Sequence, residues 1–328
     1  MHDFLSQDLS TNSYAVAEQR GTGSCLVLQY HRVATLSFDP LQLAVEPYHF
    51  EQQMEYLAQN FNVVSMDQMK HHLETSQPFR QRTVAVTFDG GYRDVLCTAK
   101  EILQRYNIFA TVFTSSAHII EGGNFWWEEL EDFLVANQFK GHLKLEIDHQ
   151  MYEWSLATQL EKFRAYEDLY SILSNKKPSE QISIIEQLTT SLEFEAEELD
   201  NHGTLNAQEL RELDQGGLIA IGGHTHNNVK LSSLPKWRQI EEVLRNKDIL
   251  EEVLKHKIEY FSYPFGNDSG YSTDTIDILQ NMDYSLACGN SYGTISMTEL
   301  TSQYDLPRVK VGNWNTFTFY RFLRQFFD

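Results

Sequence analysis

The decapeptide TVAVTFDGGY, residues 83–92, decides the fold. Its first six residues are apolar or β-branched without alternation, a pattern typical of a strand covered on both faces. A helical pattern follows from Tyr92 to Tyr106, so Asp89 is expected at the carboxyl end of a parallel strand. Active sites of α/β barrels lie at that end. Capping of the following helix would explain an aspartate at this position equally well.

Strand and helix patterns alternate along the rest of the chain. Short apolar runs predict further strands at residues 25–30, 62–65, 108–113, 218–222, 258–263, 284–288 and 306–311. Apolar stripes predict helices at Pro47–Asn60 and Leu234–His256. The stripe of the second consists of Ile240, Val243, Leu244, Leu250 and Leu254. The alternation predicts parallel βαβ units and an α/β fold, layered or barrel-shaped, of which we favour the barrel.

One region interrupts this alternation. From about residue 125 to residue 206 the sequence is mostly helical and polar, and it is longer than an ordinary connection between a strand and a helix. We therefore predict an N-terminal extension at 1–24 and a barrel at 25–328 with a helical insertion at about 125–206. The acidic stretch Glu193–Asp200 is expected to be a solvated helix face or loop rather than a metal site.

Composition and charge narrow the class of protein. The 328 residues include 26 basic and 46 acidic side chains, a formal net charge of −20, and 41% are hydrophobic. This apolar content excludes a disordered chain, and the charge disfavours nucleic acid and anionic lipid as partners. No apolar run of about 18 residues and no signal-peptide pattern occur, so we expect no membrane span and a cytoplasmic location. Cys25, Cys97 and Cys288 show no CxxC spacing, and each is expected to be a small buried hydrophobe.

Three further motifs follow or end predicted strands. GGHTHNN, residues 222–228, brings two histidines to a strand end, where imidazoles serve as metal ligands or acid–base groups. Twelve histidines in the chain make some clustering expected by chance. FSYPFG, residues 261–266, leads from a strand into a turn, and YHRV, residues 30–33, ends the first strand with His31.

In this order the motifs resemble those of the polysaccharide deacetylase family, which has the NodB homology domain and is also called carbohydrate esterase family four. TFDGGY is similar to its TFDDGY motif, GGHTHNN to its SHTxxHP motif and FSYPFG to its substrate-groove motif. YHRV, the segment FWWEELE (125–131) and LPRVKVGNW (306–314) resemble a branch with a helical insertion. The resemblance runs from about Leu26 to Phe327.

The resemblance implies a distorted (β/α) barrel that hydrolyses the N-acetyl group of a sugar or glycan. Family members bind one divalent metal, typically zinc, through an aspartate and two histidines, and a neighbouring aspartate activates a metal-bound water. By this resemblance Asp89 is the base, Arg308 orients Asp89 or the substrate, and His31 is a candidate acid. The implied substrate-binding residues are Tyr92, Tyr263, Pro264 and Trp314.

The chain departs from the family pattern at the metal. The metal-binding aspartate falls on Gly90 and the second histidine on Asn228, so only His224 keeps its expected identity. His224, His226 and Asn228 would form a weak ligand set, because an asparagine amide is a poor zinc ligand compared with imidazole. A zinc-type metal is therefore a doubtful cofactor. Replacing Gly90 by Asp together with Asn228 by His is expected to rebuild the site if the backbone resembles the family's.

Three functions remain open from the sequence. The first is a working deacetylase, or a related amide hydrolase, on an N-acetylated sugar or glycan intermediate. The second is a catalytically inactive protein of the same fold that binds a glycan or a partner, which Gly90 and Asn228 suggest. The third is a metal-free amide hydrolase that uses Asp89 and His224.

Overall fold

A parallel sheet carries Asp89 at the edge where its strands end. The structure is a computed structural model that describes residues 23–136, 139–191, 203–266, 270–296 and 302–327. Within these residues eight parallel strands pair in the order β11-β10-β9-β6-β5-β1-β12, with β4 paired to the start of β5. The strands are β1 Cys25–Tyr30, β4 Asn62–Val63, β5 Thr83–Gly90, β6 Ala110–Thr114, β9 Ile219–Gly223, β10 Tyr260–Ser262, β11 Leu286–Cys288 and β12 Val309–Lys310.

The two ends of this strand order approach each other. Cys288 of β11 forms a parallel bridge with Leu306, and Val309 of β12, only three residues further on, pairs with Leu28 of β1. The backbone N–H of Gly289 donates to Leu306 O at 2.9 Å. The sheet therefore curls into a distorted barrel, which confirms the predicted fold class.

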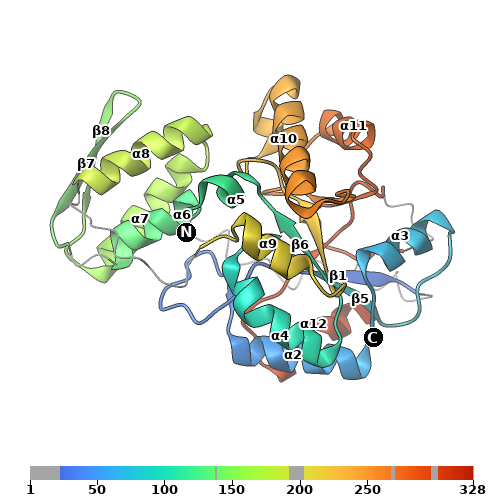
Figure 1. Ribbon diagram of the computed structural model, residues 1–328. Helices are drawn as coiled ribbons and strands as arrows, with labels where there is room; N and C mark the ends of the chain where they lie inside the picture. Colours follow the sequence, from blue (N-terminus) through green and yellow to red (C-terminus); the bar gives the residue numbers. More distant parts are fainter. Residues whose placement is uncertain (1–22, 137–138, 192–202, 267–269, 297–301, 328) are drawn as a thin grey trace. The chain divides into compact units, whose positions relative to one another are not determined.

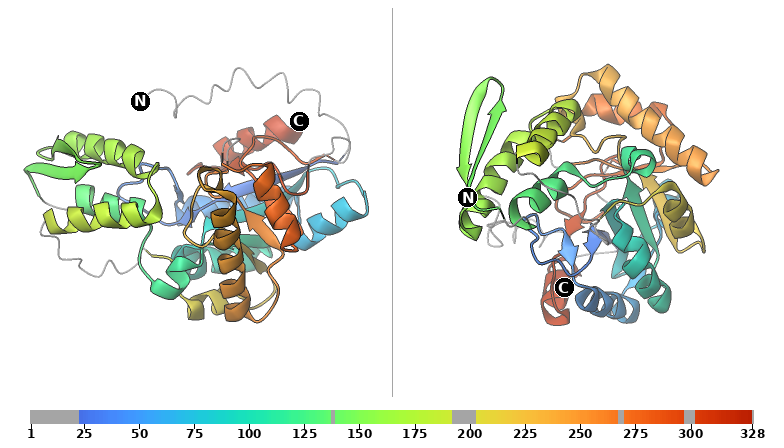
Figure 2. Two further views of the ribbon diagram at one scale, coloured as in Figure 1. Left: turned by 90° about the horizontal axis from the view of Figure 1, so that it is seen from above. Right: turned by 60° about the vertical axis from the view of Figure 1, so that its left-hand side comes forward.

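Helices connect the strands and cover the sheet. Figure 1 and Figure 2 show α2, α4 and α12 grouped together, while α10 and α11 lie side by side elsewhere on the sheet. The connecting elements are α2 Pro47–Asn60, α3 Met66–Glu74, η2 Val95–Ala99, α4 Lys100–Tyr106, α5 Ala117–Glu121, α9 Ala207–Asp214, η4 Leu231–Ser233, α10 Lys236–Leu254, α11 Thr273–Asn281 and α12 Thr316–Phe327, with the short strands β2 Arg32–Val33 and β3 Ala44–Val45.

Several local predictions hold to the residue, and others shift. β1 and α2 have the predicted bounds, and α2 buries Phe50, Met54 and Leu57 as its stripe requires. The predicted helix at 92–106 begins as the π-helical segment η2, and Cys97 on it is exposed, so the prediction of three buried cysteines is wrong there. Periodicity alone could not place Cys97, because η2 departs from 3.6 residues per turn.

The buried face of α10 differs from the predicted stripe. Val243 and Leu250 are buried as predicted, but Ile240 and Leu244 are exposed. The polar residues Gln239 and Asn246 are also buried. These polar side chains are buried because they form hydrogen bonds with backbone carbonyls. Gln239 donates to Leu234 O, and Asn246 donates to Thr114 O at the end of β6. A hydrophobicity pattern does not identify a helix face whose polar side chains are buried by hydrogen bonds to the backbone of other segments.

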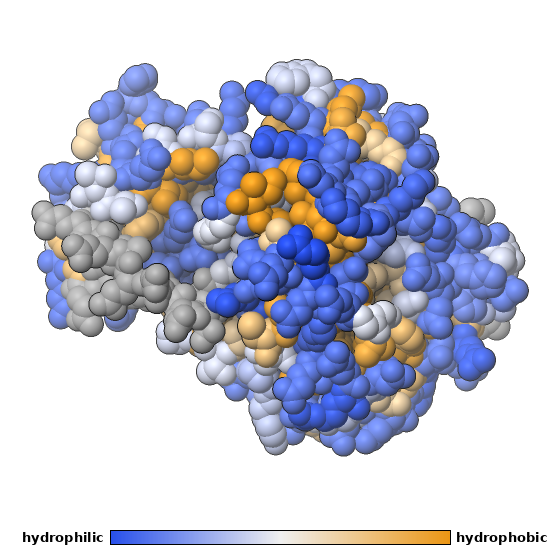
Figure 3. Space-filling view, viewed as in Figure 1, coloured by the Kyte–Doolittle hydropathy of each residue, from blue (hydrophilic) through white to orange (hydrophobic). Residues whose placement is uncertain are grey.

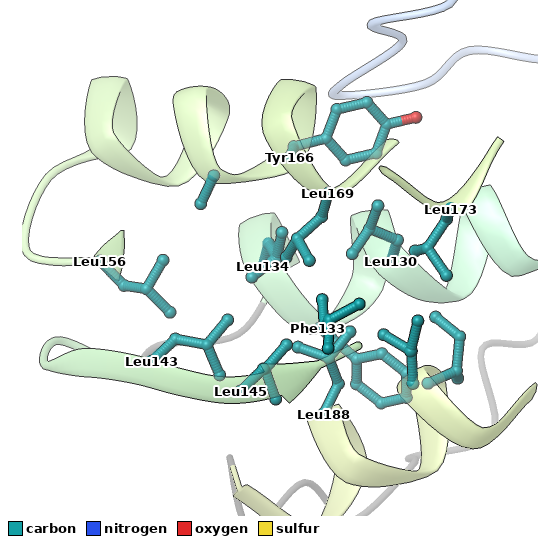
Figure 4. Packing of buried hydrophobic residues seen from close by; sticks show 14 residues of the cluster. Leu130, Phe133, Leu134, Leu143, Leu145, Leu156, Tyr166, Leu169, Leu173 and Leu188 are labelled. Carbon is teal, nitrogen blue, oxygen red and sulfur yellow. The ribbon is translucent and has the colours of Figure 1, made fainter. Parts of the chain in front are cut away.

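Residues 121–204 form a second compact unit with its own core. Its elements are α6 Trp126–Glu131, η3 Asp132–Ala136, β7 His142–Ile147, β8 Gln150–Ser155, α7 Gln159–Leu173 and α8 Pro178–Ser191. Figure 4 shows Leu143 and Leu145 of β7 packed toward Leu134, with Leu169 of α7 and Leu188 of α8 in the same cluster.

This unit is not purely helical. β7 and β8 form an antiparallel hairpin in which Leu143, Leu145 and Ile147 alternate with exposed polar residues. The alternation HLKLEI is a strand signal within a region whose composition predicts helices. The predicted extension at 1–24 and the acidic stretch Glu193–Asp200 lie outside the described residues, apart from residues 23 and 24.

Most of the face shown in Figure 3 is hydrophilic, and apolar residues gather in several patches on it. Among the described residues, no helix is both long and apolar enough to cross a membrane.

Candidate active site

Asp89 lies in a saturated ion pair at the end of β5. It is 3% exposed, and the Arg308 guanidinium, which is also buried, contacts both of its oxygens: Nη1 donates to Oδ1 and Nη2 to Oδ2, each at 2.7 Å. Gln29 Nε2 donates to Oδ2 at 2.7 Å, and Ser262 Oγ donates to the same oxygen at 3.2 Å. This two-pronged geometry is the strong form of an arginine–carboxylate pair.

The Arg308 guanidinium also donates hydrogen bonds to groups other than Asp89. Its Nε donates to Gly289 O at 2.8 Å, and Nη2 also donates to Ser262 Oγ and Asn290 Oδ1, each at 2.7 Å. Arg308 therefore orients Asp89, and its donors are occupied by the protein rather than directed at a substrate.

The ion pair determines the charge of Asp89. Burial by itself would raise the pKa of this carboxyl, but the positive charge of Arg308, with its hydrogen bonds and the nearby His224, outweighs burial and holds the pKa well below its usual range. Asp89 is thus a carboxylate at every physiological pH. A carboxylate with so low a pKa is a weak proton acceptor, so its strength lies in electrostatics and positioning.

His224 follows β9 and shares Ser262 with Asp89. Its Nδ1 bonds to Ser262 O at 2.8 Å, while the hydroxyl of Ser262 bonds to Asp89. A carbonyl only accepts, so the His224 proton lies on Nδ1 and Nε2 carries a lone pair. Burial lowers the pKa of His224, and the nearby Asp89 offsets this only in part, so the ring is neutral at neutral pH.

Helix α10 holds the loop that carries His224. Asn246 is fully buried; its Oδ1 accepts from His224 N at 3.1 Å, and its Nδ2 donates to Thr114 O at 3.0 Å. Four residues earlier, the carboxylate of Glu242 accepts from Asn227 N at 2.8 Å and from Asn227 Nδ2 at 2.6 Å. Asn246 and Glu242 therefore fix the position of the loop relative to β6 and β9.

The three residues expected to hold metal do not converge. His224 bonds toward β10, but His226 Nδ1 pairs with Ser116 Oγ at 2.9 Å beyond β6, on the other neighbour of β9. Thr225 and Asn228 have φ of +58° and +53°, so residues 224–228 are neither a continuous strand nor a helix turn. In the described part of the chain no group of three His, Cys, Asp or Glu side chains is placed to hold a metal ion.

The backbone at Gly90 is also unlike a ligand position. Gly90 has φ +102° and Gly91 has φ +75°, and a Cβ on Gly91 would lie 2.6 Å from Thr114 Cγ2. An L-aspartate adopts φ near +100° only with strain. The residues present therefore do not fit a divalent metal, and restoring the family's side chains would not by itself supply the missing geometry.

His31 directly follows β1 and is the neighbour of Asp89 across the strand pair. Tyr30 pairs with Phe88, so the next residues along the two strands are His31 and Asp89. The His31 side chain is partly exposed, but its Nδ1 is buried without a hydrogen-bond partner. Desolvation of the ring lowers its pKa to about 3, against an opposing effect of Asp89, so His31 is neutral at neutral pH.

The predicted substrate-binding residues are mostly core. Tyr92 is 1% exposed, with the Arg32 guanidinium 4.8 Å from its ring centre, and Pro264 is buried. Tyr263 is fully buried; its ring stacks on Tyr271 at 3.8 Å, and its hydroxyl donates to Tyr304 O. These two tyrosines offer no open face to a sugar. Trp314 is half-buried against Phe322, so it keeps some accessible surface.

Sequence reasoning missed four residues of the network: Gln29, Ser262, Asn246 and Asn290. Gln29 and Ser262 are polar residues inside otherwise apolar strands, and this pattern could have identified them. Asn246 gave no such signal, because an asparagine in a charged helix is unremarkable by composition.

Known proteins share this fold. The deacetylase PplD of Streptococcus pyogenes, solved in complex with acetate, matches with a TM-score of 0.61 and 17% identity over 94% of this chain and 100% of that chain. IcaB from Ammonifex degensii matches with a TM-score of 0.58 and 18% identity over 94% and 99% of the two chains. A de-N-acetylase from Aggregatibacter actinomycetemcomitans matches with a TM-score of 0.57 and 14% identity over 91% and 98%.

Comparison by sequence matches a smaller part of the chain than comparison by structure. No curated protein matches the chain significantly. The model of the polysaccharide deacetylase family matches residues 164–287, which include the GGHTHNN and FSYPFG motifs. Over these residues the chain is similar to polysaccharide deacetylases, and over 94% of its length it shares the fold of the solved deacetylases.

Proposed function

We propose that the chain is a deacetylase-like hydrolase that cleaves the amide bond of an N-acetyl group on a sugar or glycan. One observation carries the proposal: Ser262 joins Asp89 and His224 in a single hydrogen-bonded network at the ends of β5, β9 and β10. These two residues stand where the family motifs place its base and its first histidine. PplD, which has the same fold, was solved with acetate, the acid that N-deacetylation releases.

The chemistry divides between His224 and Asp89. His224 Nε2 accepts a proton from a water whose oxygen attacks the acetyl carbon, and the same proton then passes to the departing nitrogen as the C–N bond breaks. The products are acetate and an amine. Asp89 stabilises the imidazolium that forms in between, since the two side chains are close enough for the carboxylate to raise the pKa of the ring.

The proposed hydrolysis proceeds without a resident divalent metal. The donor set supports this part of the proposal, because Gly90 has no side chain, His226 bonds Ser116, and Asp89 is committed to Arg308. Metal-bound water is a stronger nucleophile than free water. We therefore expect slow turnover compared with metal-dependent enzymes.

A glycan-binding protein without hydrolytic activity is the second candidate. The same two replacements, Gly90 and Asn228, favour it, because they remove the groups with which the family activates water. The saturated Asp89–Arg308 pair would then be a structural remnant of the ancestral site.

Acetate release distinguishes these functions. Purified protein is incubated with N-acetylglucosamine oligosaccharides, with and without EDTA, and acetate is followed by NMR. We expect EDTA-resistant release that falls by about a hundredfold or more in His224→Ala, as loss of a general base predicts. The control His71→Ala replaces an exposed histidine on α3 and should match the wild type. Binding without acetate release would support the second candidate, and loss of release with EDTA would refute the metal-free mechanism.

A further inference from the structure

The unpartnered nitrogen of His31 identifies the tautomer of this ring. A neutral imidazole carries one proton, on Nδ1 or on Nε2. Nδ1 is buried without a partner, and in proteins a buried N–H without a partner is rarer than a buried acceptor that is not fully satisfied. The side chain is partly exposed, so a proton on Nε2 can be satisfied by solvent or by a ligand. The favoured tautomer therefore has an N–H on Nε2.

His224 has the opposite tautomer. Its Nδ1–H is held by Ser262 O, which leaves Nε2 as an acceptor. Tyr30 pairs with Phe88, so His31 is next to Asp89 along the strand pair, and Asp89 raises the pKa of both rings. The site thus combines one imidazole that accepts a hydrogen bond with one that donates, at the ends of β9 and β1.

We propose that His31 donates its Nε2–H to the carbonyl oxygen of the N-acetyl group and stabilises the negative charge that develops there. This inference rests on the proposed hydrolysis and assigns to His31 the carbonyl-polarising role that a metal has elsewhere in the family. It replaces the expected role of His31 as a proton-donating acid. A ring that is neutral at neutral pH has no imidazolium to donate from, but it can polarise a carbonyl as a hydrogen-bond donor.

Kinetics of position-31 variants test the role. His31→Leu removes the donor with similar volume, and His31→Gln keeps an N–H donor. Loss of one donor to a developing oxyanion typically lowers kcat by about 10²–10³-fold. We expect that loss in His31→Leu with KM changed less than about threefold, and partial recovery of kcat in His31→Gln. His71→Ala serves as the control.

The ¹⁵N NMR signals of the histidines test the tautomers directly in the intact protein. We expect the proton on Nε2 of His31 and on Nδ1 of His224, and a shift of the His31 Nε2–H signal when an N-acetylglucosamine trisaccharide is added. A proton on Nδ1 of His31, or wild-type kcat in His31→Leu, would overturn the inference while leaving the proposed function intact. Absence of acetate release from the wild type would refute the proposed function and, with it, this role of His31.

Discussion

The candidate site has two sides, which differ in how many of their polar atoms form hydrogen bonds with other protein groups. On one side, Asp89 and Arg308 bond to each other twice and to Gln29, Ser262 and Asn290. On the other side, His31 makes no side-chain hydrogen bond within the described residues, and His224 makes one through Nδ1. The first side is part of the folded core, and the second keeps atoms available for a ligand.

This difference separates positioning from chemistry. A buried charge must be paired, so the Asp89–Arg308 side can change only at a large cost in stability. A neutral imidazole tolerates an unmade bond better than a charge does. Substitutions on the first side should therefore act mainly on folding, and those on the second side mainly on turnover.

The largest expected effect is on folding, from Arg308→Met. It leaves the Asp89 carboxylate buried without its partner, and breaking a buried pair costs about 3–5 kcal/mol of unfolding free energy. Urea denaturation followed by circular dichroism measures it. Arg238→Met removes an exposed ion pair with Glu241 on α10 and should cost less than about 1 kcal/mol. Equal losses in the two variants would show that the buried pair has no special role.

Asn246→Ala should have the next largest effect. It leaves His224 N buried and unpaired, at about 1–3 kcal/mol, and removes the side-chain bond to Thr114 O on β6. Because the same bond positions His224, acetate release should fall further than the folded fraction does. Asn281→Ala on α11 removes an exposed side-chain bond to Asp277 O and provides the control. Unchanged stability and turnover in Asn246→Ala would contradict the positioning role.

Acid should weaken the Asp89–Arg308 side. The folded-state pKa of Asp89 lies below the ordinary value near 3.9, so its contribution to stability is present above about pH 4 and is lost as pH falls further. One such carboxyl changes the unfolding free energy by at most about 1.4 kcal/mol per pH unit. The stability difference between wild type and Asp89→Asn should therefore shrink between pH 5 and pH 2. A difference that stays constant would place the pKa of Asp89 at its ordinary value.

The smallest expected effect is on zinc affinity. The double variant Gly90→Asp and Asn228→His restores the family's side chains, yet we expect no zinc binding by titration calorimetry. The reason is that Gly90 has φ +102° and His226 is directed at Ser116. The single variant Asn228→His keeps Gly90, so it shows the effect of the added imidazole without backbone strain at position 90. One bound zinc per chain in the double variant would mean that the loops adjust more readily than this backbone suggests.

The comparison also shows where sequence reasoning reached the site. Asp89 and His224 were predicted from strand-end motifs and Arg308 from the family resemblance, and all three belong to one network. The weaker ligand set was predicted from the same motifs, but His226 and Asn228 depend on the path of a loop. The positive φ angles of Thr225 and Asn228 determine that path, and the residue types of the motif do not predict these angles.

The sequence by itself determined the alternation of strands and helices, the resemblance of its strand-end motifs to those of polysaccharide deacetylases, and the presence of Gly90 and Asn228 in those motifs, because these follow from local periodicity and residue identity. Only the tertiary structure decided that Arg308, 219 residues after Asp89, saturates its carboxylate, and that a buried asparagine of α10 holds His224. It also decided that Nδ1 of His224 is bonded and that Nδ1 of His31 has no partner. Such facts depend on which polar groups meet when distant strands and helices pack, and short-range pattern does not contain that information.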